Sequence, residues 1–416
     1  MRMKYLLFLV LTSYMTSCTR SQPEPNPETT DSDREPIPFL KDSILLDQGR
    51  YCIMETPLIY EDYLLIMTTN WDTREGWINC YDKDSLELKW RWQEALDEFG
   101  APAKGFGFVS YVHDGILAIA QSNLSYGINI QTGQTIWKNR DIDSAASAIF
   151  GNKNTIANTR IVDSKTHRTI ISADISNGIW NTNFEFMKND TLDVGLGTPL
   201  PFTWNEKEYL TFVSTKWTSS AQTRINKLNL YNQTDGILEW TSDTIPLYQP
   251  LSGKPGVQPE FEDGQIILGN DALYSYNVED GSLEWWEWEW YGNSFVSYGS
   301  HLTTADGIVY ANNASQFLVG IDVHTGEEII NTITGGTPSP VEFHNGKCYM
   351  SSLTVGGTNR LMIIDGLTGE ILQNVKAPFR SEDRDWTFER AIAVDPETGL
   401  VYTADHKYLL VYDFED

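Results

Sequence analysis

The sequence predicts an all-β fold, an eight-bladed β-propeller made of four-stranded antiparallel blades. Two observations lead to this fold. A short phrase recurs along the chain about every 45 residues, and most copies are preceded by two apolar segments joined by a tight turn. Repeats of this period with several short strands in each unit are typical of propellers.

The recurring phrase is an apolar strand that ends in Asp or Asn, with a glycine four residues later and a tryptophan four residues after the glycine. The acid or amide side chain can cap its own turn, and glycine supplies a positive φ at a hairpin corner. We expect the tryptophan, on the outer strand, to fill the space between neighbouring blades. The copies begin at Asp82, Asn129, Asp163, Asn232, Asn277, Asp322, Asp365 and Asp413. The copy at Asp163 lacks both the glycine and the tryptophan, and eight copies predict eight blades.

Two further expectations concern the ends and the spacing of the repeats. The last copy stops at Asp416, directly after its third strand, so its outer strand has to come from elsewhere. The stretch Ser43–Ile53 is the expected donor, because a ring closed by strands from both termini has no open edge. The wide gap between Asp163 and Asn232 predicts an insertion at residues 176–198 that projects from one face.

The N-terminus has the features of a bacterial lipoprotein signal. Two basic residues precede a short apolar run at residues 6–11, and small residues stand directly before Cys18. The run is far shorter than the roughly 20 residues that span a bilayer, so residues 1–17 are expected to be a signal peptide. Lipidation is expected at Cys18. Thr19 is not the aspartate associated with retention at the inner membrane, which favours the outer membrane, with the domain facing the periplasm or the cell surface.

Composition divides the rest of the chain into a tether and one large domain. Residues 18–42 are rich in Pro, Ser, Thr and acids and lack apolar periodicity, so we expect a flexible tether there. Residues 43–416 are expected to form the propeller. The formal net charge of −27 argues against nucleic acid as a partner and against direct binding to anionic lipid, which leaves the lipid anchor as the contact with the membrane.

The aromatic residues after the fifth copy offer a candidate binding surface. Trp286, Trp288 and Trp290 alternate with glutamates, which places them on one face of a strand. They are either inter-blade packing or an aromatic platform for sugar rings or a partner protein. Trp71 and Trp77 form a second aromatic candidate with the same two interpretations.

The sequence contains no recognisable catalytic or metal-binding motif. The cysteines are Cys18, Cys52, Cys80 and Cys348, and no pair has the spacing of metal ligands. Cys80 and Cys348 lie in apolar strands, where cysteine usually behaves as a small buried hydrophobic residue. Export would permit a Cys52–Cys80 disulfide but does not require one.

The phrase Asp-x-x-Thr-Gly-x-x-x-Trp resembles the repeat of the pyrroloquinoline-quinone-type (PQQ-like, or quinoprotein-like) propellers over roughly residues 43–416. Together with the signal, the chain is most similar to the lipoprotein propellers of the outer-membrane β-barrel assembly machine. That resemblance implies a non-catalytic scaffold that binds protein partners in the cell envelope, such as a β-barrel assembly protein. A glycan-binding lipoprotein that uses exposed tryptophans is the alternative.

The same superfamily contains quinone-dependent dehydrogenases, so an enzyme is a third alternative. In those enzymes the cofactor stacks between a tryptophan and a disulfide of adjacent cysteines, beside a calcium ion. No two cysteines are adjacent in this chain, and it has no CxxCH haem-attachment motif. We therefore expect no cofactor and no catalytic residues.

Overall fold

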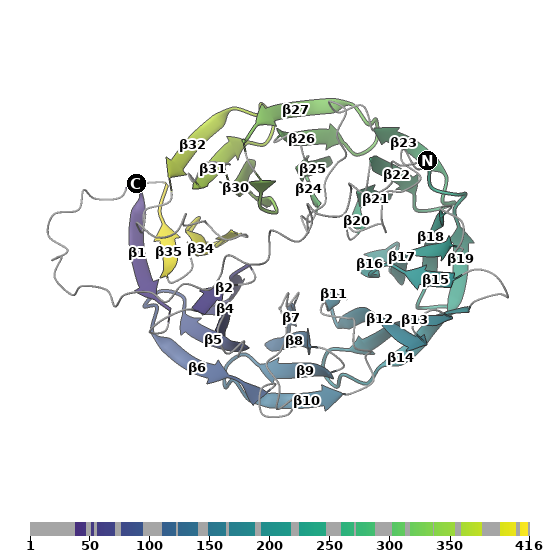
Figure 1. Ribbon diagram of the computed structural model, residues 1–416, viewed down its shortest axis with the longest axis horizontal. Helices are drawn as coiled ribbons and strands as arrows, with labels where there is room; N and C mark the ends of the chain where they lie inside the picture. The colour runs from purple at the N-terminus through teal and green to yellow at the C-terminus, as the bar shows by residue number, and fades with distance from the viewer. Residues whose placement is uncertain are drawn as a thin grey trace, which may run out of the picture. The chain divides into compact units, whose positions relative to one another are not determined.

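The computed structural model describes residues 38–46, 51–53, 56–70, 76–94, 110–121, 124–139, 149–163, 166–187, 193–217, 224–246, 259–269, 272–287, 302–312, 317–335, 337–353, 359–376, 392–404 and 408–414. Pro38–Asp416 form one compact unit. Its strands make eight antiparallel sheets arranged in a ring, so the predicted eight-bladed propeller is confirmed (Figure 1). The described residues include no helix long and apolar enough to cross a membrane.

The first four blades follow one another along the chain. Blade 1 contains β2 (Tyr51–Ile53), β3 (Leu58–Tyr60), β4 (Tyr63–Asn70), β5 (Gly76–Asp82) and β6 (Leu88–Trp92). Blade 2 contains β7 (Tyr111–His113), β8 (Ile116–Gln121), β9 (Leu124–Asn129) and β10 (Thr135–Asn139). Blade 3 contains β11 (Phe150–Asn152), β12 (Thr155–Asp163), β13 (His167–Asp174) and β14 (Asn181–Met187). Blade 4 contains β15 (Asp193–Leu196), β16 (Leu200–Trp204), β17 (Lys207–Trp217), β18 (Arg224–Asn232) and β19 (Ile237–Thr241).

The last four blades complete the ring. Blade 5 contains β20 (Glu260–Glu262), β21 (Gln265–Gly269), β22 (Leu273–Asn277) and β23 (Leu283–Glu287). Blade 6 contains β24 (Thr303–Ala305), β25 (Ile308–Asn312), β26 (Phe317–Asp322) and β27 (Glu328–Ile333). Blade 7 contains β28 (Thr337–Pro338), β29 (Glu342–His344), β30 (Lys347–Leu353), β31 (Asn359–Asp365) and β32 (Ile371–Lys376). Blade 8 contains β33 (Ala393–Val394), β34 (Val401–Ala404), β35 (Tyr408–Tyr412) and β1 (Leu40–Leu45).

The hydrophobic core is divided among the seams between neighbouring blades. One cluster joins blades 1 and 2 through residues such as Met67 and Leu117, and another joins blades 5 and 6 through residues such as Leu273 and Val319. Similar clusters occupy the seams between blades 2 and 3, 3 and 4, 4 and 5, 6 and 7, and 8 and 1. The eight sheets share no strand pairing, so side-chain contacts between neighbouring blades are what hold the ring together. Burial of each aliphatic side chain stabilises its seam by about 1.5–3 kcal/mol.

The recurring phrase caps the turn between the third and fourth strands, as predicted. In blade 6 the Asp322 carboxylate accepts hydrogen bonds from the backbone N–H groups of His324 (2.9 Å) and Thr325 (2.8 Å). The N–H of Gly326 donates to the Asp322 carbonyl at 3.0 Å, and Gly326 has a φ of 73°. The same carboxylate capping by Asp365 recurs in blade 7.

The phrase tryptophans connect neighbouring blades, also as predicted. The indole Nε1 of Trp285 donates to the carbonyl of Val323 in the next blade at 2.8 Å. The corresponding bonds run from Trp90 to Ile130, from Trp137 to Ile175 and from Trp240 to Val278. The glycine of the next phrase lies against each of these rings, and a Cβ built on Gly326 would stand 2.9 Å from the Trp285 ring. The glycine is therefore required both by its φ and by the close approach of the indole.

The prediction for the third blade was wrong in one respect. Asp163 ends β12, which is the second strand of the blade, and the turn after the third strand begins at Asp174. The N–H of Gly178 donates to the Asp174 carbonyl, and Gly178 packs against Trp137 of blade 2. The tryptophan of this copy, Trp180, follows its glycine by two residues instead of four, and its Nε1 donates to Ser125 in blade 2.

The described residues of the predicted insertion, 176–187 and 193–198, do not project from the propeller, and residues 188–192 lie outside the described part. The described residues contain the outer strand of blade 3, β14, and the first inner segment of blade 4, β15. The extra length of this part of the chain is accommodated in blade 4, where β17 has 11 residues and β18 has 9. Longer strands absorb the additional residues within the sheet.

Ring closure by the two ends of the propeller is confirmed, with a different donor segment. β1 pairs antiparallel with β35, and Leu40 lies opposite Tyr412 (Figure 1). The closing strand is therefore Leu40–Leu45, three residues earlier at its start than the predicted Ser43–Ile53. Tyr51–Ile53 form β2 instead, which pairs with β4 in blade 1.

Candidate functional site

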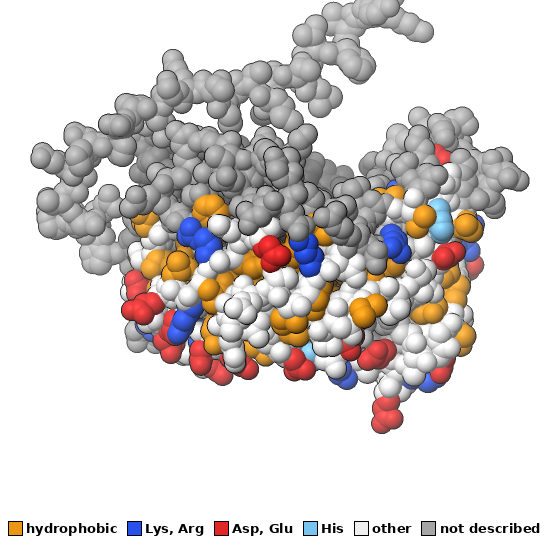
Figure 2. Space-filling model, turned by 90° about the horizontal axis from the view of Figure 1, so that it is seen from below, with side chains coloured by type: hydrophobic (Ala, Val, Ile, Leu, Met, Phe, Trp, Pro, Cys, Tyr) orange, Lys and Arg blue, Asp and Glu red, His pale blue; other side chains and the backbone are white. Residues whose placement is uncertain are grey.

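The tight turns of the propeller gather on one face, which we call the turn face. In seven blades the residue that starts the second strand lies opposite the residue that ends the third, as Tyr63 lies opposite Asp82 and Ile308 opposite Asp322. In blade 4 the offset is two residues, with Tyr209 opposite Asn232. The first-to-second and third-to-fourth turns therefore stand at the same end of every blade. Figure 2 shows acidic side chains gathered along the lower margin of the described part.

The turns themselves carry many more acids than bases. Their acidic residues include Glu61, Asp62, Asp82, Asp84, Asp114, Asp174, Glu206, Asp235, Asp263, Glu279, Asp280, Asp306, Asp322, Asp365 and Glu397, whereas their basic residues are Lys83, Lys153, Lys207 and Lys347. Such a surface attracts cationic groups and repels anionic ones, an effect that salt screens over about 10 Å.

Of the predicted aromatic candidates, the structure describes two. Trp286 is 37% exposed on the outer strand β23, and its ring stacks on that of Tyr274 with a centroid distance of 6.3 Å and an interplanar angle of 7°. Trp77 is buried in blade 1, and the Arg91 guanidinium lies 4.6 Å from the centre of its ring. Trp77 is thus part of the core. Trp71, Trp288, Trp290 and Cys18 lie outside the described residues.

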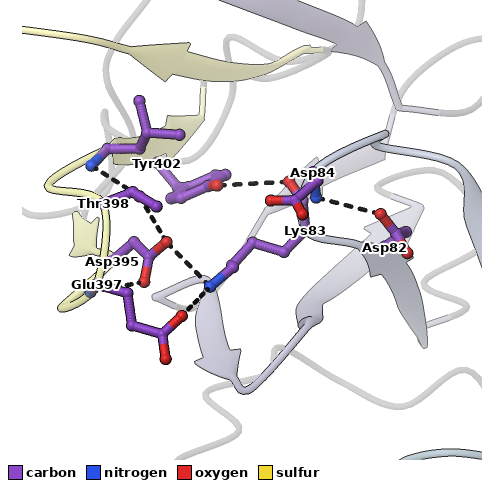
Figure 3. Close-up of polar contacts among 8 residues, drawn as sticks. Asp82, Lys83, Asp84, Asp395, Glu397, Thr398 and Tyr402 are labelled. Carbon is purple, nitrogen blue, oxygen red and sulfur yellow. Dashed lines mark hydrogen bonds and ion pairs between the residues drawn. The ribbon is translucent and has the colours of Figure 1, made fainter.

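The seam between blades 8 and 1 contains an ionic cluster that the sequence analysis missed (Figure 3). The Lys83 ammonium lies 3.1 Å from Asp395 and 3.2 Å from Glu397, and both the Lys83 and Asp395 side chains are buried. Lys83 follows the anchor Asp82, a position that is aliphatic in four other blades, where Ile130, Ile175, Val278 and Val323 stand, and glutamine in blade 4, where Gln233 stands. A buried cation at this one seam could have been noticed from that mismatch.

The partners in this cluster hold each other in their charged forms. Burial opposes charge on Lys83, but the carboxylates of Asp395 and Glu397 outweigh it and raise the pKa of the ammonium. Burial also opposes ionisation of Asp395, yet hydrogen bonds from Thr398, the Glu397 backbone and Lys83 keep the pKa of Asp395 below its usual range. The Lys83 ammonium and the Asp395 carboxylate therefore both stay charged near neutral pH, and their role is to hold blades 8 and 1 together rather than to exchange protons.

Two carboxyl groups on the innermost strands have pKa values shifted in the opposite direction. Burial, with the charge of Glu262, raises the pKa of Glu260 on β20 to about 8. Burial raises the pKa of Glu342 on β29 to about 7. Both residues begin a short strand of their blade, and both are half-buried.

The described residues do not fit a quinone cofactor of the dehydrogenase type. Cys80 and Cys348 are free thiols in blades 1 and 7, so Cys80 does not form the disulfide with Cys52. Burial raises the pKa of each thiol to about 12, which makes them inert core residues. Within the described ranges, no three His, Cys, Asp or Glu side chains are placed to hold a metal ion.

Comparison with known proteins shows a resemblance to the PQQ-like propellers. A family model described as outer membrane protein assembly factor BamB matches residues 208–407, which extend from β17 through blades 5, 6 and 7 into blade 8. A search of curated protein sequences gives no match.

Solved structures share the fold at low sequence identity. BamB from Moraxella catarrhalis superimposes with a TM-score of 0.57 and 14% identity, covering 90% of this chain and 99% of that one. The quinohemoprotein alcohol dehydrogenase from Comamonas testosteroni gives a TM-score of 0.62 and 10% identity over 90% of this chain and 76% of the enzyme. The computationally designed Ika8 protein gives 0.59 and 12% identity over 88% and 98%.

Proposed function

We propose that this PQQ-like β-propeller, which resembles the outer membrane protein assembly factor BamB, is a non-catalytic scaffold that binds protein partners in the bacterial cell envelope. In this proposal residues 1–17 are a signal peptide, Cys18 carries the lipid anchor, and the residues between Cys18 and Pro38 connect it to the propeller. The predicted tether, residues 18–42, is therefore too long at its end, because Leu40–Leu45 form the strand β1 of blade 8. The outer membrane is the proposed location, with the domain in the periplasm or at the cell surface.

The observation that carries the proposal is the structural use of the recurring phrase. Its acids and amides cap turns, its glycines accommodate indole rings, and its tryptophans bond to the next blade. These residues build the ring and are not available to substrates. What remains for function is the surface. The fold brings a first-to-second-strand turn from eight blades and a third-to-fourth-strand turn from seven blades to one face, so that surface is broad and suited to a macromolecule.

The described residues fit a quinone cofactor poorly, and this supports a binding role over an enzymatic one. The free cysteines are buried singly, and the ionic cluster at Lys83 is held in one charge state. A catalytic acid or base needs a pKa near the working pH together with access to a reacting group. Glu260 and Glu342 meet the first condition, but within the described ranges they belong to no group of side chains placed to hold a metal ion.

Chemical crosslinking in the native envelope tests the proposal. The full chain with a C-terminal affinity tag, crosslinked in its own cells and purified under denaturing conditions, should capture a small set of outer-membrane proteins. The Cys18→Ala variant is the matched control, because it keeps the propeller and loses the anchor, and it should be released from membranes and lose these partners. Identical membrane fractionation of both proteins, or crosslinks no different from those of an unrelated lipoprotein, would contradict the proposal.

Glycan binding is the second candidate function, and Trp286 is the observation that favours it. Its ring is partly exposed and lies flat on Tyr274, which is an arrangement that sugar rings can extend by stacking. The alternation with Trp288 and Trp290 along the sequence would lengthen the same surface.

A further inference from the structure

A cleft opens on the turn face at the seam between blades 1 and 2. Its volume is about 220 Å³, and its lining includes Tyr60, Glu61, Tyr63, Asp114 and Ile130. The first three residues come from the β3–β4 hairpin of blade 1, and the other two from the turns of blade 2. The cleft therefore exists only when the two blades are packed together.

Hydrogen bonds at the seam hold the walls of the cleft in place. The hydroxyl of Tyr60 accepts a hydrogen bond from the backbone N–H of Gly115 at 3.0 Å, which connects one wall to the neighbouring blade. The side chain of Ile130 is fully buried, and its carbonyl accepts a 2.7 Å hydrogen bond from Trp90. A binding site with fixed walls loses little conformational entropy when it is filled.

Two aromatic rings distinguish this hairpin from its counterparts. Tyr60 and Tyr63 are cross-strand partners on either side of the turn. The residue pairs at the same place in the other two-residue hairpins are His113 and Ile116, Asn152 and Thr155, Trp204 and Lys207, Glu262 and Gln265, Ala305 and Ile308, and His344 and Lys347. Among the described hairpins, two aromatic rings flank the turn in blade 1 alone.

Two carboxylates stand at the same cleft. Glu61 and Asp114 are the first turn residues of blades 1 and 2, with φ angles of 50° and 48°, and both are exposed. The Asp114 carboxylate lies 3.6 Å from the imidazole Nε2 of His113, and the His113 and Tyr111 rings stack beside it. Carboxylates supply net negative charge, and the faces of tyrosine rings add the quadrupole attraction that favours a cation.

We propose that this cleft binds an organic cation, the guanidinium or ammonium group of an arginine or lysine side chain on a partner protein. The size favours a single side chain, because 220 Å³ is below the roughly 300 Å³ at which pockets for whole small molecules begin. The surrounding acidic turns would guide a basic partner to this face. The inference rests on the proposed scaffold function and narrows its partner to one with a protruding basic residue.

The test uses N-acetyl-arginine methylamide as the probe, with N-acetyl-citrulline methylamide as the neutral analogue of nearly the same shape. Binding to the full chain is followed by ligand-observed NMR at low salt. The arginine derivative should bind, and the citrulline derivative should bind at least about tenfold more weakly. Equal binding of the two probes would overturn the proposal, and so would tighter binding of tetramethylammonium than of the arginine derivative.

A pair of matched variants separates the cleft from the general field of the acidic face. Glu61→Gln combined with Asp114→Asn removes two charges from the cleft, and Asp263→Asn combined with Asp306→Asn removes two from the equivalent turn positions of blades 5 and 6. Only the first pair should weaken binding of the arginine derivative, by about tenfold. Equal losses of affinity in the two double variants would show that the overall negative charge of the turn face attracts the probe, and this would overturn the proposed site.

The same variants distinguish failure of the cleft from failure of the scaffold function. Crosslinking to envelope partners that persists in the Glu61→Gln/Asp114→Asn protein would refute the cleft and leave the scaffold function intact. Selective binding of the arginine derivative by a chain that captures no envelope partner would refute the scaffold function and leave the cleft.

Discussion

The ammonium of Lys83 lies 3.1 Å from the carboxylate of Asp395, joining the first blade to the last. The hydroxyl of Tyr402 adds a 3.5 Å hydrogen bond to the Lys83 carbonyl at the same seam. Four other seams have a tryptophan bond at the corresponding carbonyl. The seam that closes the ring is therefore held differently from those four.

We expect Lys83→Met to destabilise the propeller by about 3 kcal/mol, because it leaves the buried Asp395 carboxylate without its cation. Glu397→Gln is the matched control, since Glu397 contacts the same ammonium but its side chain is 74% exposed. That change should cost less than about 1 kcal/mol. Urea unfolding followed by circular dichroism measures both, and equal effects of the two substitutions would mean that burial does not govern this cluster.

Gly326→Ala should be clearly more destabilising than Gly346→Ala. Both glycines have a φ of 73°, so each substitution carries the same backbone penalty of about 1 kcal/mol. A Cβ on Gly326 would also stand 2.9 Å from Trp285, whereas no atom lies within 4 Å of a Cβ on Gly346. The overpacking should add about 1–3 kcal/mol to the first variant. Thermal unfolding of the two proteins side by side decides the matter, and equal stability loss would show that the indole moves aside freely.

The raised pKa values of Glu260 and Glu342 predict a pH dependence of stability. The ordinary pKa of glutamate is about 4.3, and the folded values are about 8 and about 7. The folded state thus binds more protons than the unfolded state between these limits, and the stabilising contribution present below about pH 4 is lost as pH rises through 7 and 8.

Replacing both carboxyls by amides, Glu260→Gln with Glu342→Gln, should flatten the fall in unfolding free energy between pH 5 and pH 9. The exposed pair Glu87→Gln and Glu327→Gln is the control and should leave the slope as in the wild type. Urea titrations at several pH values provide the comparison. A slope that is unchanged by Glu260→Gln with Glu342→Gln would refute the assignment.

Trp286 distinguishes the two candidate functions. Because this side chain is 37% exposed, Trp286→Ala should cost less than about 1 kcal/mol, while Trp285→Ala should cost about 3 kcal/mol or more through the lost inter-blade packing and hydrogen bond. Intrinsic fluorescence during titration with bacterial envelope oligosaccharides reports sugar stacking. Quenching in the wild type that disappears in Trp286→Ala would favour the glycan-binding function over the scaffold.

The recurring phrase was sufficient to predict the propeller because its residues act locally. An aspartate at the end of an apolar strand caps its own turn whatever the rest of the chain does, so most anchors could be placed from sequence. Asp163 was misplaced because β12 and β13 both end in aspartate after apolar residues. The anchor at Asp174 was hidden because Trp180 comes two residues too early in the phrase.

The candidate sites could not be predicted in the same way, since they depend on contacts across seams. Lys83 and Asp395 stand near opposite ends of the propeller sequence, and only closure of the ring brings them together. The cleft combines Tyr60 of one blade with Asp114 of the next, and its shape depends on how the two sheets pack. The pattern of a single strand can mark Lys83 as unusual for its position, but it does not indicate which residues meet across a seam.

The pairing of β1 with β35 has a mechanical consequence. Leu40 and Tyr412 meet at the turn face, where the N–H of Asp413 donates to the carbonyl of Phe39 and the ring of Phe39 contacts that of Phe414 at 5.1 Å. A pulling force on the segment that precedes β1 would load these contacts first. If β1 then separates from β35, the pair formed by Leu40 and Tyr412 is the first to open. The strand that closes the ring is thus also the first part of it to meet such a force.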